Sequence, residues 1–282
     1  MPNRTEIKLT IGTNVIQTGV GHDWILSRIT GESYPEYSVP INEYADDDGG
    51  YTTNKRYAPR YIRLWLMSRA GSSAIIDATE LLLREYLDIE ATAEITVYKH
   101  GVERNLYAGT VAAVEQLKEK WTHRPYISIT LLFPDPWMLG ESIENTFRSS
   151  IPLLTFPWNS VVDVGITSGL VSSGDTATVT NSGHKETGFV LTLTANDAVT
   201  NPKVENASGL FVEAIASLSA GETVAISTVR GNKYVRKNGV FCPYNLSSTF
   251  FSLARGDNVI TVSTTAGTVT KSLIYSERYR GV

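Results

Sequence analysis

The chain has 282 residues, of which 42% are hydrophobic and 19% are charged. These are the proportions of a globular protein rather than a disordered one, and the length is enough for two cores. Because Cys242 is the single cysteine, an internal disulfide framework is excluded. The 25 basic and 29 acidic residues give a formal charge of −4, so the whole chain has no electrostatic attraction for nucleic acid or anionic lipid.

Apolar runs in the sequence are short. A membrane span needs about 18 uninterrupted apolar residues, and no segment approaches that length. The first residues also lack the apolar stretch of a secretory leader. We therefore expect a soluble protein, made in a reducing compartment, that makes no contact with a membrane.

Charge is distributed unevenly along the chain. The net charge is −5 over residues 1–148, −5 over 149–229 and +6 over 230–282. Opposite charges at the two ends favour head-to-tail contact between copies. The alternative is that strands of one domain mix these charges on a common surface, and the sequence leaves both interpretations open.

A change of composition divides the chain into two domains. All five tryptophans precede residue 159, and from Ile166 onward the sequence becomes rich in Ser, Thr, Val and Gly. Several prolines interrupt the stretch between, where helices and central strands cannot continue. We predict an N-terminal domain over 1–137, a linker over 138–165 and a second domain over 166–282.

The first domain is predicted to be a β-sandwich or split barrel with one helix and a long hairpin. The helix is expected over Ser73–Leu87, where apolar residues recur at helical spacing after a serine cap. Residues 31–60 are expected to form a long irregular loop. The exposed end of a hairpin is expected at 117–124, and the closing strand of the domain at Tyr126–Phe133. The strands before them are predicted because they alternate polar and apolar residues. They are Glu6–Thr13, Trp24–Ile29, Tyr61–Met67, Glu94–Lys99 and Asn105–Val114, with a turn near His100-Gly101.

The second domain is predicted to contain only short strands separated by turn signals. Such spacing is typical of a jelly-roll β-sandwich. The predicted strands are Ala177–Asn181, Phe189–Ala195, Lys203–Asn206, Leu210–Ile215, Glu222–Ser227, Tyr234–Lys237, Asn258–Ser263 and Thr268–Tyr275.

The sequence carries no recognisable catalytic, metal or cofactor motif. The four histidines do not have metal-ligand spacing, and Cys242 has no cysteine partner. Nucleophile elbows, phosphate-binding loops and dinucleotide fingerprints are missing. The acidic run Asp46–Asp48 has oxygen ligands but not the spacing of a calcium loop, and it predicts an exposed loop tip. We expect no enzyme activity and no cofactor.

A basic and aromatic stretch at 51–63 permits three interpretations. Tyrosines interleaved with Lys and Arg can stack on single-stranded nucleic acid. Lys and Arg also protect the edge of a sheet from mispairing. The third possibility is a contact between subunits.

The order of these segments resembles the distal tail (Dit) protein family of siphoviruses, the phages with long non-contractile tails. In the first domain the resemblance lies in the segments 60–66, 106–111 and 134–137 around the predicted helix. In the second it lies in an ordered series of turns and strands. This series comprises 178–184, 201–212, 220–227, 235–240, 248–260 and the final Tyr279–Val282.

The resemblance implies a structural role in the virion, at the tail tip, after synthesis in the cytoplasm of a bacterial host. It implies an N-terminal ring-forming domain followed by a galectin-like β-sandwich. The implied partners are five further copies in a hexameric ring, the tail tube protein and the tip, fibre or baseplate proteins. DNA is expected to pass through the ring without specific binding.

Residues for the ring and partner contacts are predicted from the basic stretch and the hairpin end. They are Lys55, Arg56, Arg60, Lys118, Lys120 and Trp121. The alternative function is a carbohydrate-binding module that contacts the host surface. Against it, no tryptophan follows Trp158 to stack on a sugar, and His184 lacks the cluster of polar residues found in galectins.

Overall fold

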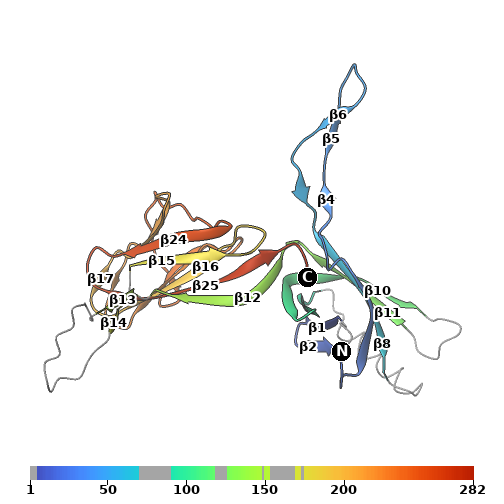
Figure 1. The fold of residues 1–282 in the computed structure, drawn as a ribbon, viewed down its shortest axis with the longest axis horizontal. Helices are drawn as coiled ribbons and strands as arrows, with labels where there is room; N and C mark the ends of the chain where they lie inside the picture. Colours follow the sequence, from blue (N-terminus) through green and yellow to red (C-terminus); the bar gives the residue numbers. More distant parts are fainter. Residues whose placement is uncertain (1–4, 70–89, 118–125, 148, 153–168, 173–174) are drawn as a thin grey trace. The chain divides into compact units, whose positions relative to one another are not determined.

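A computed structural model describes residues 5–69, 90–117, 126–147, 149–152, 169–172 and 175–282 (Figure 1). The predicted helix over 73–87 and the hairpin end over 117–124, apart from Leu117, lie outside these residues. All regular elements in the described part are strands, so the prediction of a mainly β protein is confirmed. The chain divides into two compact units, one formed by 1–141 with 278–282 and the other by 142–277.

The first unit contains two sheets that share one long strand. The strand order is β2-β1-β9-β10-β12 in one and β3-β8-β11-β10 in the other. Their bounds are β1 Glu6–Ile11, β2 Asn14–Gln17, β3 Trp24–Thr30, β8 Arg60–Ser68, β9 Ala93–Lys99, β10 Val102–Leu117, β11 Tyr126–Phe133 and β12 Met138–Thr146. The turn between β9 and β10 lies at His100-Gly101 as predicted, with positive φ at both residues.

Strand β10 passes from one sheet to the other because its register breaks twice. Its first half pairs with β9 and its second half with β11, with shifts between Leu106 and Gly109 and between Val111 and Ala113. Such irregularities bend a strand. A Cβ at Gly109 would lie 2.4 Å from the ring of Phe133, so glycine lets this ring pack against the bend. The alternating apolar residues of both sheets, such as Leu9 and Leu64, meet in one core.

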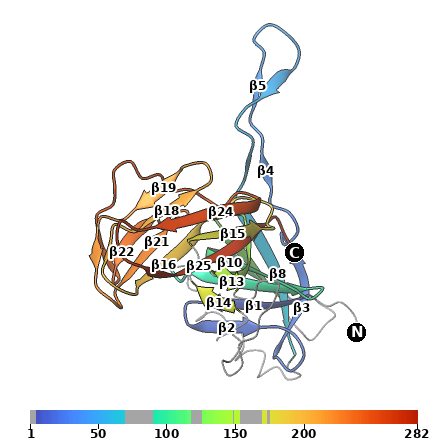
Figure 2. The ribbon, with the colours of Figure 1, turned by 60° about the vertical axis from the view of Figure 1, so that its left-hand side comes forward.

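Residues 34–58 form a two-stranded ribbon that we call the arm. Strand β4 (Tyr37–Ser38) pairs with β7 (Arg56–Tyr57), and β5 (Ile41–Glu43) pairs with β6 (Gly50–Thr52). The ribbon extends away from the sheets of its own unit, as two views show (Figures 1 and 2). The prediction of an irregular loop over 31–60 is therefore wrong, because this segment is folded back and paired along its length.

The second unit is a two-layer β-sandwich. One layer has the order β15-β24-β18-β19, and the other has β12-β25-β16-β21-β22-β23. Residues of both layers, such as Leu191 and Val262, pack in one core. The bounds are β15 Thr176–Asn181, β16 Phe189–Ala195, β18 Lys203–Asn206, β19 Phe211–Glu213, β21 Thr223–Ser227, β22 Tyr234–Lys237, β23 Val240–Phe241, β24 Gly256–Ser263 and β25 Val269–Tyr279. Two small pairs accompany them, β13 (Ser149–Pro152) with β14 (Gly169–Ser172) and β17 (Val199–Thr200) with β20 (Ser217–Leu218).

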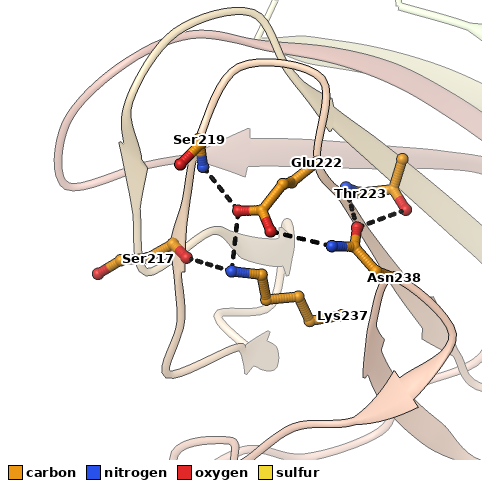
Figure 3. A network of polar contacts seen from close by, with 6 residues as sticks. All are labelled: Ser217, Ser219, Glu222, Thr223, Lys237 and Asn238. Carbon is orange, nitrogen blue, oxygen red and sulfur yellow. Dashed lines mark hydrogen bonds and ion pairs between the residues drawn. The ribbon is translucent and has the colours of Figure 1, made fainter.

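A polar network centred on Glu222 holds the turns beside β21 and β22 (Figure 3). The Glu222 carboxylate lies 2.8 Å from Nζ of Lys237 and accepts hydrogen bonds from the backbone N–H of Ser219 and the side-chain amide of Asn238. Asn238 in turn accepts a bond from the backbone N–H of Thr223. These donors, with Lys237 first, lower the pKa of Glu222.

Candidate assembly surfaces

The arm has no core of its own. Every residue from Val39 to Thr52 is exposed, on both faces of the ribbon. Large apolar side chains are among them, including Ile41 at 66% exposure and Tyr44 and Tyr51 at 51% each. An isolated two-stranded ribbon is at best marginally stable in water, and exposed apolar side chains of this density mark a contact surface. The arm therefore presents an apolar surface that is accessible to another molecule.

The outer part of the arm, residues 41–52, is strongly acidic. We call it the arm tip. It contains Glu43, Asp46, Asp47 and Asp48 and no basic residue. Its turn is closed by a hydrogen bond from the N–H of Tyr44 to the carbonyl of Gly49. In the described parts of the chain, no group of three or more His, Cys, Asp or Glu side chains is arranged to hold a metal ion.

Aromatic rings anchor the base of the arm to its own unit. Tyr37 and Tyr57 lie across the ribbon from each other, with ring centroids 5.2 Å apart. Tyr57 packs edge-on against Trp137, with centroids 4.9 Å apart, and Trp137 is only 5% exposed. Edge-to-face ring pairs add stability beyond the area that they bury. The base is therefore fixed in position while the tip is exposed.

Arg60 joins the two ends of the arm to the C-terminus. Its guanidinium donates to the carbonyl of Pro136 at 2.7 Å, to that of Gly31 at 2.8 Å and to that of Arg280. The side chain is buried, and burial lowers the pKa of Arg60 to about 10, against a raising effect of the Glu32 charge. At neutral pH the group stays protonated, so all its N–H groups can donate.

The C-terminal residues add further contacts around Arg60, and we call these contacts together with its three hydrogen bonds the clamp. Arg278 pairs with Asp135, and Arg104 lies 3.6 Å from the centroid of the Tyr279 ring. The N–H of Val282 donates to the backbone carbonyl of Glu32. The side-chain carboxylate of Glu32 pairs with Nζ of Lys99 at 3.4 Å. The last five residues therefore belong structurally to the unit that carries the arm.

The predicted contact residues fall into three groups. Lys55 and Arg56 are exposed on the returning strand of the arm, close to its base. Arg60 lies in the interior of its unit at 1% exposure, where it holds the arm rather than presenting a charge to a partner. Lys118, Lys120 and Trp121 lie outside the described residues.

Sequence reasoning missed the apolar side chains of the arm, which are its most exposed surface. The signal was present as tyrosines recurring through a segment with many turn-forming residues. The burial of Arg60 also had a signal in the sequence, because residues two apart in a strand lie on one face and Ile62 and Leu64 are apolar. Two-residue strands give no periodicity that could have predicted the ribbon itself.

Comparison with known proteins defines the class. The family described as siphovirus-type tail component, C-terminal domain, matches residues 182–279, which contain strands β16 to β25. No curated protein matches the chain. No helix in the described ranges is long and apolar enough to cross a membrane. Residues 182–279 are thus similar to a siphovirus tail component domain.

Solved structures extend the likeness to the whole chain. The crystal structure of the Dit protein of phage SPP1, called a paradigm of the hub adsorption apparatus in phages that infect Gram-positive bacteria, is 11% identical. It superposes with a TM-score of 0.69, over 96% of this chain and 98% of that one. A chain of the phage P2 baseplate in its activated conformation with Ca is 9% identical, with a TM-score of 0.55 over 99% and 100% of the two chains. The chain as a whole therefore has the fold of the Dit protein.

Proposed function

We propose that this chain is the structural hub of a siphovirus tail tip. Copies of it form a hexameric ring that connects the tail tube to the baseplate or tip proteins, and the genome passes through the ring. The proposal is carried by the match of the second unit to the siphovirus tail component family, and the full-length Dit fold supports it. The protein acts in the virion by binding other proteins, without catalysis.

The arm supports the assembly part of this proposal. A ring of identical copies needs a heterologous contact, in which one surface of each copy meets a different surface of the next. An exposed apolar ribbon with an anchored base supplies one of these two surfaces. Lys55 and Arg56 are retained as proposed contact residues at its base, together with Lys118, Lys120 and Trp121. A galectin-like description of the second unit likewise remains part of the proposal.

The solution mass of the purified full chain tests the proposal. Mass photometry or light scattering should find a species of six times 30.9 kDa, or a pair of such rings. The tail tube protein, added in excess, should bind this species and not a monomer. A chain that stays monomeric both alone and with the tail tube protein would contradict the ring.

A further inference from the structure

The second unit carries an exposed aromatic and basic surface at the edge of its larger sheet. Tyr234 and Arg236 alternate with buried Val235, so both lie on the outer face, and Phe241 pairs with Arg236 in the neighbouring strand. The guanidinium carbon of Arg236 lies 4.3 Å from the Tyr234 ring centroid and 4.6 Å from that of Phe241. We call Tyr234, Arg236, Val240 and Phe241 the edge patch.

The edge patch contains large apolar side chains that are mostly exposed to solvent. Val240 is 72% exposed and Phe241 is 70% exposed. Within the described structure, Nε of Arg236 is buried between the rings and has no hydrogen-bond partner. A cation over an aromatic face is a favourable contact, and Tyr and Arg are enriched among the residues that dominate binding energy at protein interfaces.

The segment that carries the edge patch is rich in basic residues. Residues 223–256 contain five basic residues and no acidic one. Lys237 is paired with Glu222 (Figure 3), whereas Arg230 and Lys233 are exposed. The surface therefore favours an acidic partner that also has apolar side chains.

The geometry of the edge favours a polypeptide as that partner. Strand β23 is the last strand of its sheet in the described topology. A sheet edge can take a further strand through its backbone groups, with side chains adding specificity. A ribbon that brings its own strands would suit this edge.

The chain itself supplies a segment with this chemistry. The arm tip, 41–52, has four acidic residues, no basic residue and three exposed apolar side chains, Ile41, Tyr44 and Tyr51. We propose that the arm tip of one copy binds the edge patch of a neighbouring copy. This inference rests on the proposed ring, and it adds a contact between the arm and the second unit to those that the first units make.

Cross-linking between two differently marked chains tests this contact directly. One full chain carries Asp47→Cys and the other Val240→Cys, both in a Cys242→Ser background, so each has one thiol. The two are mixed in denaturant, refolded together and treated with a short bis-maleimide. We expect a covalent dimer in the mixture and far less in either chain alone. The matched control replaces Val240→Cys by Val259→Cys, on the other sheet of the same unit, where no dimer should form.

A charge exchange tests whether the complementarity matters. Reversing the arm tip with Asp46→Lys, Asp47→Lys and Asp48→Lys should weaken ring association about tenfold or more, because like charges then face each other. Reversing the edge patch region with Arg230→Glu, Lys233→Glu and Arg236→Glu should do the same. The chain with all six changes should regain most of the lost association, which simple misfolding would not allow.

The outcomes separate this inference from the proposed function. If the wild-type chain forms rings but no dimer is cross-linked and the reversals leave association unchanged, the contact is refuted while the hub proposal stands. A cross-link formed within a single chain carrying both cysteines, without dimers, also refutes it. So does a patch that binds cell-wall polysaccharide, loses that binding with Phe241→Ser, and gives no cross-link. A wild-type chain that never associates refutes the ring instead.

Discussion

Arg60 illustrates how a single side chain can hold a segment that projects into solvent. Ile62, Leu64 and Leu66 follow Arg60 on the same strand and the same face, and all three are buried. The alternation along the strand therefore places a guanidinium where an apolar side chain is expected. The cost of burial is offset by three carbonyl acceptors from segments far apart in the sequence. The fork of N–H groups of an arginine can reach all three, which one ammonium cannot.

Arg60→Lys should therefore destabilise the first unit although the charge is kept. We expect the free energy of unfolding to fall by about 3 kcal/mol, because buried carbonyls lose their donors. Urea unfolding followed by tryptophan fluorescence measures it, since four of the five tryptophans lie within residues 1–141. Arg63→Lys, an exposed site on the same strand, is the control and should change stability by less than about 0.5 kcal/mol. Equal effects at the two sites would contradict the clamp.

Glu222 predicts a pH dependence of stability in the second unit. Its pKa is lowered in the folded chain, first by the hydrogen bond from Lys237. A lowered carboxyl pKa contributes stability that is present above the ordinary value, 4.5, and is lost as the pH falls through the lower folded value. Glu222→Gln should therefore lower the Tm at pH 7, and the difference from wild type should shrink as the pH falls below 4.5.

Thermal unfolding followed by circular dichroism across that pH range checks this expectation. The matched control is Glu186→Gln, an exposed carboxylate of the same unit for which the described structure shows no ion pair. It should leave the Tm difference constant with pH. A Tm difference at Glu222 that persists in acid would mean that the ionised carboxylate is not the source of the stability.

At the scale of elements, the arm differs from every other ribbon in the described chain because its end has nothing to pack against. The hairpin of β9 and β10 lies in a sheet and buries Ile95 and Val97, whereas β5 and β6 bury nothing. An element of this kind adds no buried apolar surface to the isolated chain. In the proposed ring, such an element contributes stability through contact with a neighbouring copy.

Shortening the arm should remove association and leave the fold intact. Replacing residues 39–55 by Asn-Gly keeps the pairing of Ser38 with Arg56 and closes it with a two-residue turn. We expect unfolding of the first unit to change by less than about 1 kcal/mol, since no buried residue is removed. Mass photometry should show the loss of rings. Should the deletion itself misfold, Ile41→Ser with Tyr51→Ser tests the same surface, and rings that survive both changes would contradict the arm's role.

The sequence predicted those elements whose residues report on a core. Strand β22 has the predicted bounds Tyr234–Lys237, and the turn after it has positive φ at Asn238 and Gly239. Strand β18 also matches, because Val204 alternates with polar neighbours. The arm was missed for the same physical reason, since a ribbon exposed on both faces has no alternation. The clamp around Arg60 was missed because its acceptors are backbone carbonyls, which no residue type reveals.

At the scale of the whole chain, the two units are not separated at one point in the sequence. Strands β12 and β25 each contribute residues to both, and the chain returns to the first unit for its last five residues. The returning segment bonds to the base of the arm through Arg60 and Glu32. The first unit is therefore incomplete without the C-terminus.

This connection predicts different outcomes for two shortened chains. A chain ending at residue 149 lacks one of the three acceptors of Arg60, the partner of Asp135 and the ring that contacts Arg104. A second chain joins residue 141 to 278 by a short flexible linker, which is feasible because β12 and β25 are neighbours in the sheet order. We expect the second to be more stable by about 2–4 kcal/mol, as buried charged and hydrogen-bonded groups keep their partners.

Urea unfolding by tryptophan fluorescence and mass photometry should be measured on both shortened chains. If the ring contacts lie mainly in the first unit, the linked chain should still assemble. Its association should be weaker than that of the full chain, because it lacks the edge patch. The chain ending at 149 should assemble poorly. Adding back a peptide of residues 278–282 to the latter should restore part of its stability, because the contacts of Arg278 and Tyr279 are local to it. Equal free energies of unfolding for the two chains would show that the C-terminal segment contacts the first unit but does not stabilise it.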